Sequence, residues 1–180
     1  YDVLDRNVAG ERMRRQQAWL ENTLADIRGA GPSATSCLAV MWHTPLYSSG
    51  WHKGSGEHMR TLWDVVDRHG ADLVLSGHEH FYERFGPLDA NGRSPRDARA
   101  PRQFVVGTGG ARLYGFWKPP FRSESRVLQH GVLQLALDAG GYGWRFVDIG
   151  GRVRDAGSAR CRGSMKSGNV PGTAAAPNAD

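Results

Sequence analysis

The sequence predicts an α/β fold in which helices and strands alternate at first and strands then follow one another. Two segments have helical periodicity, and a short apolar strand signal comes after each of them. The helical segments are residues 12–28 and 57–69. The strand signals are residues 37–42, 71–76, 103–106, 131–137 and 142–149. With 180 residues, 39% of them hydrophobic and 23% charged, the chain has the length and composition of one globular domain.

The first predicted helix, residues 12–28, is amphipathic and ends at a clear stop signal. Its apolar side chains are Met13, Leu20, Leu24 and Ile27, and Gly29 and Gly31-Pro32 follow it. The preceding stretch YDVLDRN, residues 1–7, is expected to be a connecting loop. Because it has no Met and no cationic or apolar leader, we expect the chain to begin within a longer protein.

The next strand signal, CLAVMW at residues 37–42, is apolar throughout and is therefore expected to be buried. His43 stands at its carboxyl end. A loop rich in Ser, Gly and His follows and leads to the helix at residues 57–69. That helix has its apolar residues at helical spacing, and Gly70 closes it.

The stretch LVLSGHEHFYERF, residues 73–85, places His78 and His80 just after the second strand. Two strands joined by one helix are expected to be parallel, so His43 and this pair lie at the same edge of the sheet. Imidazole is a common metal ligand, and three of them at one edge favour a metal site. His78 and His80 then share one ion or hold one each of a pair. Surface histidines without a partner are the alternative.

Several classes of protein are excluded or disfavoured by composition. No apolar run approaches the roughly 20 residues of a membrane span. The net charge of +5 favours the approach of anionic substrates, but the arginines are scattered, so a nucleic-acid partner is not predicted. Residues 163–180 lack periodicity and large apolar groups, which predicts a disordered tail after a domain at residues 1–162.

Two motifs carry a resemblance to a known family. SGHEHFYERF resembles the last signature of the calcineurin-like metallophosphoesterases, GHxH, in the GHxHxYER form of the purple acid phosphatase branch. AVMWHTPLYSSG is similar to the preceding block of that family, and FVVGTGGARLYGF and HGVLQLALDAGGYGWRFVDIGG are similar to the C-terminal strands of bacterial members. The resemblance covers residues 1–162. It implies the C-terminal half of a two-sheet α/β/β/α sandwich.

The resemblance also implies a function. Members of the family hydrolyse phosphate esters, mostly monoesters, with two metal ions, drawn from Fe, Zn and Mn, and a bridging hydroxide. It assigns His43 and His78 to one metal and His80 to the other. His52, nine positions after His43, corresponds to a histidine that contacts the phosphate or protonates the leaving group. The substrate is then a phosphorylated small molecule.

The remaining ligands of the family lie in Asn-His-Glu, Asp-x-His and Gly-Asp signatures, none of which occurs in this sequence. Asp2, Asp5 and Asn7 are the only substitutes by residue type. The missing N-terminal half of the domain is therefore an expected partner. Two alternatives stay open: a truncated, non-catalytic domain with a partial metal site, and a mononuclear zinc hydrolase that uses His43, His78 and His80.

Other polar residues have weaker predictions. Glu83 and Arg84 either orient the metal-binding loop or form a solvated ion pair. Glu79 is expected to point away from the ligands. The GTGG stretch, residues 107–110, is expected to be a tight turn near the site, and the remaining histidines are expected to be structural or exposed. These are His58, His69 and His130.

The two cysteines, Cys37 and Cys161, allow two interpretations. Two reduced thiols suit a cytoplasmic protein. Because the resemblance implies export, the expected location is secreted or extracytoplasmic, and there a Cys37–Cys161 disulfide and two free thiols both stay open.

Overall fold

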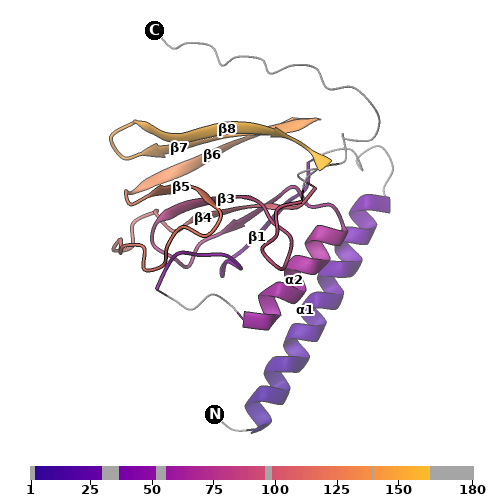
Figure 1. Ribbon diagram of the computed structural model, residues 1–180. Helices are drawn as coiled ribbons and strands as arrows, with labels where there is room; N and C mark the ends of the chain where they lie inside the picture. The colour runs from indigo at the N-terminus through magenta and orange to yellow at the C-terminus, as the bar shows by residue number, and fades with distance from the viewer. Residues whose placement is uncertain (1–2, 30–36, 52–55, 96–98, 139, 163–180) are drawn as a thin grey trace.

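The computed structural model describes residues 3–29, 37–51, 56–95, 99–138 and 140–162. In these residues the chain forms two helices, a five-stranded sheet and a three-stranded sheet. Figure 1 shows them as three layers, with both helices on one side of the larger sheet and the smaller sheet on the other. The predicted α/β class with two stacked sheets is confirmed.

The helices are α1 (Val3–Gly29) and α2 (Gly56–Arg68). The larger sheet has the strand order β1-β2-β4-β3-β5 and the smaller sheet the order β6-β7-β8. The strands of the larger sheet are β1 (Ala39–Trp42), β2 (Leu73–Ser76), β3 (Tyr82–Pro87), β4 (Arg102–Val106) and β5 (Ser123–Val127). Those of the smaller sheet are β6 (Gly131–Leu137), β7 (Gly141–Asp148) and β8 (Val153–Arg160).

Strands β1 and β2 are parallel neighbours, and α2 connects them, as the sequence predicted. Their pairing places Trp42 opposite Ser76, so both strands end at the same edge of the sheet. Strand β4 continues the parallel order on the other side of β2. The helix connection is stable because α2 buries one face, with Trp63 fully enclosed, in a core that also receives Leu20 and Leu24 of α1.

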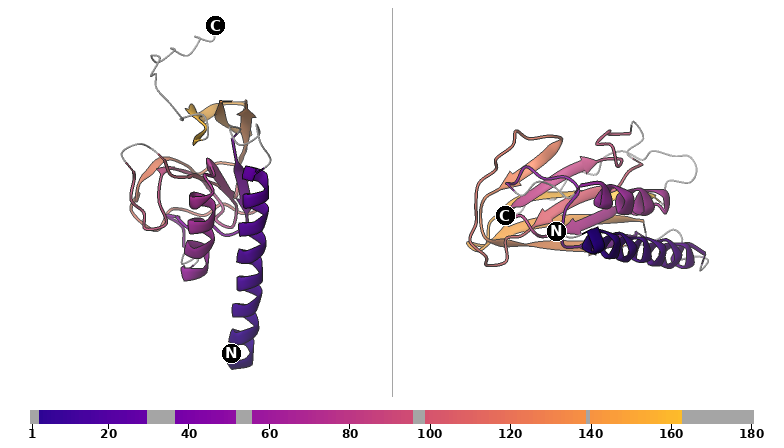
Figure 2. Two further views of the ribbon diagram at one scale, coloured as in Figure 1. Left: turned by 90° about the vertical axis from the view of Figure 1, so that its right-hand side faces the viewer. Right: turned by 90° about the horizontal axis from the view of Figure 1, so that it is seen from below.

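Helix α1 begins at Val3, so the prediction of a connecting loop over residues 1–7 is wrong for the part that the structure describes. From Val3 to Arg28 the sequence has no proline, and Gly10 is the only glycine, so nothing interrupts the helix. Figure 2 shows that the N-terminal part of α1 extends beyond α2 and away from the sheets. Neither helix in the described residues combines the length and the hydrophobicity that a membrane crossing requires.

Strand β1 is not buried as its apolar sequence predicted. It lies at the edge of the larger sheet, and the Met41 side chain is 79% exposed. An apolar run indicates that a strand can be buried. Whether it is buried depends on the strands and layers that pack around it, and the sequence of the strand alone does not contain that information. Among the described residues, β2 is the one strand that pairs with β1.

Three strands were not predicted from periodicity. Strands β3, β5 and β8 are short or polar, and in β8 most side chains are exposed. They form because their backbones pair with strands already in place: β3 lies antiparallel between β4 and β5, and β8 pairs with β7. In β8 the side chains mostly meet solvent, and in β3 buried polar and apolar residues are mixed, so neither strand has an apolar alternation that would predict it.

A partly buried carboxylate joins the two sheets. Asp155 of β8 accepts hydrogen bonds from the Tyr82 hydroxyl at 2.5 Å, from Arg84 Nε at 2.7 Å and from Trp144 Nε1 at 3.1 Å. Burial alone would raise the pKa of Asp155, but the hydrogen bonds from Arg84 and Tyr82 outweigh it, and the pKa lies below its ordinary value. Tyr82 also stacks on Phe146 with ring centroids 4.2 Å apart.

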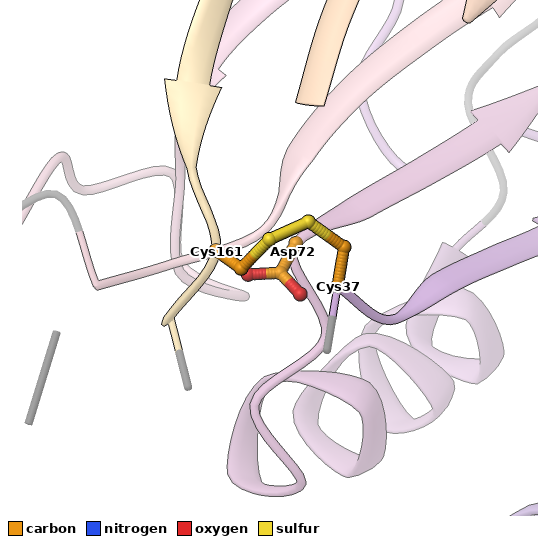
Figure 3. A group of neighbouring side chains, drawn as sticks. All are labelled: Cys37, Asp72 and Cys161. Carbon is orange, nitrogen blue, oxygen red and sulfur yellow. A yellow bond between two sulfur atoms is a disulfide. The ribbon is translucent and has the colours of Figure 1, made fainter. Parts of the chain in front are cut away.

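A disulfide closes the opposite end of the same interface. Cys37, just before β1, is bonded to Cys161, just after β8; their Cα atoms are 4.9 Å apart, and the two residues are 124 positions apart in the sequence. Figure 3 shows Asp72 beside this bond. The Asp72 carboxylate accepts hydrogen bonds from the backbone NH groups of Leu38 and Arg162, which follow the two cysteines. Of the two interpretations left open by the sequence, the structure therefore has the bridge.

We expect the Asp155→Asn variant to lose stability in a pH-dependent way. Because the folded-state pKa lies below the unfolded value of about 3.9, the ionised group stabilises the fold above that pH, and this stabilisation disappears as the pH falls through the folded-state pKa. At pH 7 the free energy of unfolding should fall by roughly 3 kcal/mol. Urea denaturation from pH 2 to 7 measures this, with the exposed Asp26→Asn as control. A pH-independent difference would contradict the role of the ionised Asp155.

Removal of the disulfide should destabilise the chain through the unfolded state. Closing a loop of this length contributes about 4 to 5 kcal/mol in the chain-entropy model. The double variant Cys37→Ala/Cys161→Ala is therefore expected to unfold at lower urea concentration, and added reductant should affect the wild-type protein only. Equal unfolding midpoints for the two proteins, with and without reductant, would show that the bridge does not form in solution.

Candidate metal centre

Two strand ends deliver His43 and His78 to the same point. His43 follows β1, and Gly77 and His78 follow β2, so the parallel register places these residues side by side. The Gly77 NH donates a hydrogen bond to the His43 carbonyl at 3.0 Å. His43 Nε2 and His78 Nδ1 are 3.1 Å apart, and the two rings are nearly perpendicular. Two ring nitrogens therefore converge at the carboxyl edge of the sheet, as the sequence predicted.

His78 has an unusual backbone conformation. Its φ is 66°, in the left-handed region that a residue with a Cβ enters at a cost of about 1 kcal/mol or more. Tight-turn hydrogen bonds hold it there, from Glu79 NH to the Gly77 carbonyl and from Phe81 NH to the Glu79 carbonyl. The segment after β2 is thus a bend and not an extended chain.

His80 is presented separately from the other two histidines. Its Nδ1 lies 2.8 Å from the carbonyl oxygen of Arg112, and its ring lies against that of Tyr114. An Nδ1–H that donates to a carbonyl leaves Nε2 as the nitrogen with a free electron pair. Among the described residues, His43, His78 and His80 do not form a compact group of three ligand atoms.

Glu79 is buried between the two histidines of its motif. It is 1% exposed, and the Tyr114 hydroxyl lies 3.1 Å from its Oε2 and 3.2 Å from the His78 carbonyl. Gly50 covers it, and a Cβ at position 50 would come within 2.0 Å of Oε2. The buried position of its side chain agrees with the expectation that Glu79 points away from the ligands. Through its contacts with Tyr114 and Gly50, Glu79 holds the bend in place.

Glu83 anchors the loop that leads from His43 toward His52. It is fully buried and accepts hydrogen bonds from the Ser49 NH at 2.8 Å and from the hydroxyls of Ser49 and Ser123. Arg84, in contrast, is directed to Asp155 and Glu124. Neither residue forms the solvated ion pair considered from the sequence, because both are buried.

The other histidines divide into two groups. His69 bonds to Glu21 at 2.6 Å, and the hydrogen bonds from His69 and Arg68 lower the pKa of that carboxyl. His130 Nδ1 lies 3.1 Å from the Thr108 carbonyl. Both therefore have structural partners. His52 lies outside the described residues, as do Asp2 and the predicted tail at residues 163–180. The side chains of Asp5, Asn7 and His58 are likewise not described.

A glycine-rich segment supports the histidine bend from the other side. Gly107, just after β4, packs so closely that a Cβ there would lie 2.0 Å from the Glu79 carbonyl oxygen and 3.2 Å from the Cα of His80. Its NH donates to the Phe81 carbonyl at 3.2 Å. The expected position of the GTGG stretch near the site is thus observed, and its first glycine is the one that the packing requires.

A second group of potential ligand atoms, Cys37, Asp72 and Cys161, lies within 4.8 Å of one another. Because the two sulfurs are bonded to each other, neither is available as a thiolate, and Asp72 is occupied by backbone NH groups. This group is a structural cross-link. The histidines are the better donors for a metal ion.

The histidine arrangement fits part of a metal site. Two nitrogens 3.1 Å apart can both reach one ion at the usual metal–nitrogen distance of about 2.0–2.1 Å. His80 offers a third nitrogen from a separate position. His43 also borders an apolar groove of about 680 Å³ between the two sheets, lined by Met41, Trp42, Leu75, Val106, Leu133 and Leu135.

Comparison with known proteins shows similarity to one family of phosphoesterases. The family model of the calcineurin-like phosphoesterases matches residues 2–82. Purple acid phosphatase 21 of Arabidopsis thaliana is 38% identical over 130 residues, which make up 67% of this chain and 28% of that relative. Fe(3+)-Zn(2+) purple acid phosphatase 12 of the same plant is 31% identical over 105 residues, 53% of this chain and 22% of that relative.

The fold is also similar to that of a purple acid phosphatase, PPD1, isolated from seeds of yellow lupin (Lupinus luteus). The TM-score is 0.71 at 23% sequence identity, with 90% of this chain and 32% of that chain covered. The chain thus spans less than a third of the length of these relatives.

The close packing of Gly107 predicts a site-specific effect of adding one methyl group. Gly107→Ala should displace the Glu79–His80 backbone and destabilise the protein by about 1 to 3 kcal/mol. Gly109→Ala is the matched control, because a Cβ at position 109 meets nothing within 4 Å. Urea denaturation measures the stability of each, and NMR shows whether the His80 resonances move. Equal behaviour of the two variants would show that Gly107 does not support the bend.

Proposed function

We propose that the chain is the C-terminal part of a metal-dependent phosphatase of the calcineurin-like phosphoesterase family, whose model matches residues 2–82. The observation that carries the proposal is the convergence of His43 Nε2 and His78 Nδ1, 3.1 Å apart, at adjacent strand ends. The similarity to purple acid phosphatases supports a phosphate monoester as the substrate, with a diester as the alternative.

We propose a binuclear centre, with His43 and His78 on one ion and His80 on the other. The separate position of His80 supports this division, and so does its Nδ1 contact with the Arg112 carbonyl, which directs Nε2 outward. The name of the Arabidopsis thaliana relative supports iron and zinc as the metals, with manganese as the alternative. When bound, the ions would supply Lewis acidity toward the phosphoryl oxygens and activate the attacking water.

The chain's own residues would orient this chemistry. The His78 bend, held by Glu79 and Gly107, fixes two ligands on a rigid strand end. Glu83 fixes the Ser49 backbone, and with it the loop that continues to His52. We propose that His52 contacts the phosphate or protonates the leaving group, a role that suits an imidazole near neutral pH.

The remaining ligands would come from an N-terminal half that docks on the open side of the chain. Strand β1 has an exposed edge, Met41 is 79% exposed, and the apolar groove between the sheets begins beside His43. A strand added to β1 would complete the larger sheet, cover the groove and bring new side chains next to His43. The chain's short span relative to its relatives supports this proposal.

Two alternatives remain as outcomes of the test. A mononuclear zinc site built from His43, His78 and His80 is less favoured, because the three ring nitrogens are not gathered into one group in the described residues. A non-catalytic domain with a partial site would keep the fold without turnover. An extracytoplasmic location is also proposed, on the support of the Cys37–Cys161 disulfide.

Metal analysis and an activity assay test this proposal on the parent polypeptide, meaning the complete translation product that contains this chain. We expect about two metal ions per molecule and release of phosphate from an aryl phosphate monoester. His80→Ala should lower kcat/KM by more than about 100-fold, because it removes a ligand. His69→Gln, which changes a histidine bound to Glu21, is the control and should change kcat/KM by less than about twofold.

One tightly bound zinc with retained turnover would favour the mononuclear site. No turnover and no stoichiometric metal would mean that the domain is non-catalytic. Faster hydrolysis of a bis-aryl diester than of the monoester would overturn the proposed substrate class while leaving the metal centre in place.

A further inference from the structure

Two tryptophans form an exposed pair on two loops that both contact the histidine bend. Trp51 is 59% exposed and Trp117 is 64% exposed, with ring centroids 4.2 Å apart and planes inclined at 67°. They come from two different loops, one after β1 and one between β4 and β5. Because one ring meets the other at an angle, the pair forms a corner with open aromatic faces.

Backbone contacts place this corner next to the histidine bend. The NH groups of Trp117 and Lys118 donate to the Ser49 carbonyl at 2.9 and 3.1 Å. The next residue after Ser49 is Gly50, which packs directly on Glu79, between the two histidines of the motif. Trp51 follows Gly50. The corner is therefore connected to the metal-binding bend by one layer of packed residues.

Buried residues hold the backbone next to the two tryptophans in place, while the tryptophan rings are exposed. Ser49 is 1% exposed and is bound by the fully buried Glu83. Phe116, next to Trp117, packs on Phe81 with ring centroids 4.4 Å apart, and the Arg126 guanidinium lies 3.9 Å above its ring. A rigid support under exposed aromatic rings is the arrangement that binds a flat ligand at little entropic cost.

The charge around the corner suits an anion. Lys118 is adjacent to Trp117 and exposed, and Arg112, whose carbonyl contacts His80, is exposed as well. The loop between β4 and β5 therefore carries two exposed cations, one next to Trp117 in the sequence and one whose backbone contacts His80. A ligand that matches these cations and the aromatic corner has a negatively charged group joined to an aromatic ring.

We propose that Trp51 and Trp117 bind the aromatic ring of an aryl phosphate ester whose phosphate group lies at the histidines. This inference rests on the proposed phosphatase function and adds a preference for aromatic leaving groups. Stacking on indole rings contributes to binding without discriminating between ring substituents, so the corner selects a class of esters. The simpler alternative is that the two rings only shield each other.

Calorimetric titration of the metal-loaded parent polypeptide distinguishes these cases. Phenylphosphonate and methylphosphonate are the probes, because both carry the same charged group and neither can be hydrolysed at its carbon–phosphorus bond. We expect the wild-type protein to bind phenylphosphonate about tenfold more tightly than methylphosphonate. Trp117→Ala and, separately, Trp51→Ala should reduce this preference to about twofold or less. Circular dichroism checks that each variant is folded.

Trp19→Ala is the matched control. Trp19 is also 64% exposed, but it lies on α1, away from this corner, so the tenfold preference should be retained. The inference about the corner would be overturned if the preference for phenylphosphonate survived in both corner variants, or if the wild-type protein lacked it. In either case, binding of methylphosphonate would leave the proposed phosphatase function intact. Failure of both phosphonates to bind would overturn the proposed function together with this inference.

Discussion

The parallel pairing of β1 with β2 is the constraint on which the rest of the site depends. It sets Trp42 opposite Ser76, and the next residues of both strands must then emerge side by side. The bond from Gly77 NH to the His43 carbonyl continues that register by one step, and the left-handed turn at His78 directs its ring back toward His43. The two nitrogens converge because the backbone leaves them little freedom, which is the preorganisation that a metal ligand pair requires.

The remaining interactions make this edge rigid from several directions. Glu79 and Gly107 support the bend, and Glu83 fixes the loop after His43. The two sheets are joined by Asp155 and by the disulfide at the other end of the interface. The same molecule leaves one side open, where the β1 edge and the apolar groove adjoin His43. The ordered histidines thus lie beside an exposed strand edge and an apolar groove.

The sequence predicted the features that have a strong local signal. The α2 crossover, the parallel strand ends and the histidine positions followed from apolar periodicity and strand order. Periodicity could not predict β8, whose side chains are mostly exposed, or the exposed position of β1, which depends on neighbouring strands. The anchoring of Ser49 by Glu83 and the Trp51–Trp117 corner join residues more than 30 positions apart, and spacing along the chain carries no signal for such contacts.

Long-range ¹H–¹⁵N NMR of the histidine rings during zinc addition tests most directly whether this chain supplies metal ligands. We expect the resonances of His43 Nε2, His78 Nδ1 and His80 Nε2 to shift, because the first two nitrogens converge and the Arg112 carbonyl occupies Nδ1 of His80. His69 and His130, which already have partners, should not shift. Uniform small shifts at all histidines, or none at His43 and His78, would contradict the assignment of the strand ends as a metal centre.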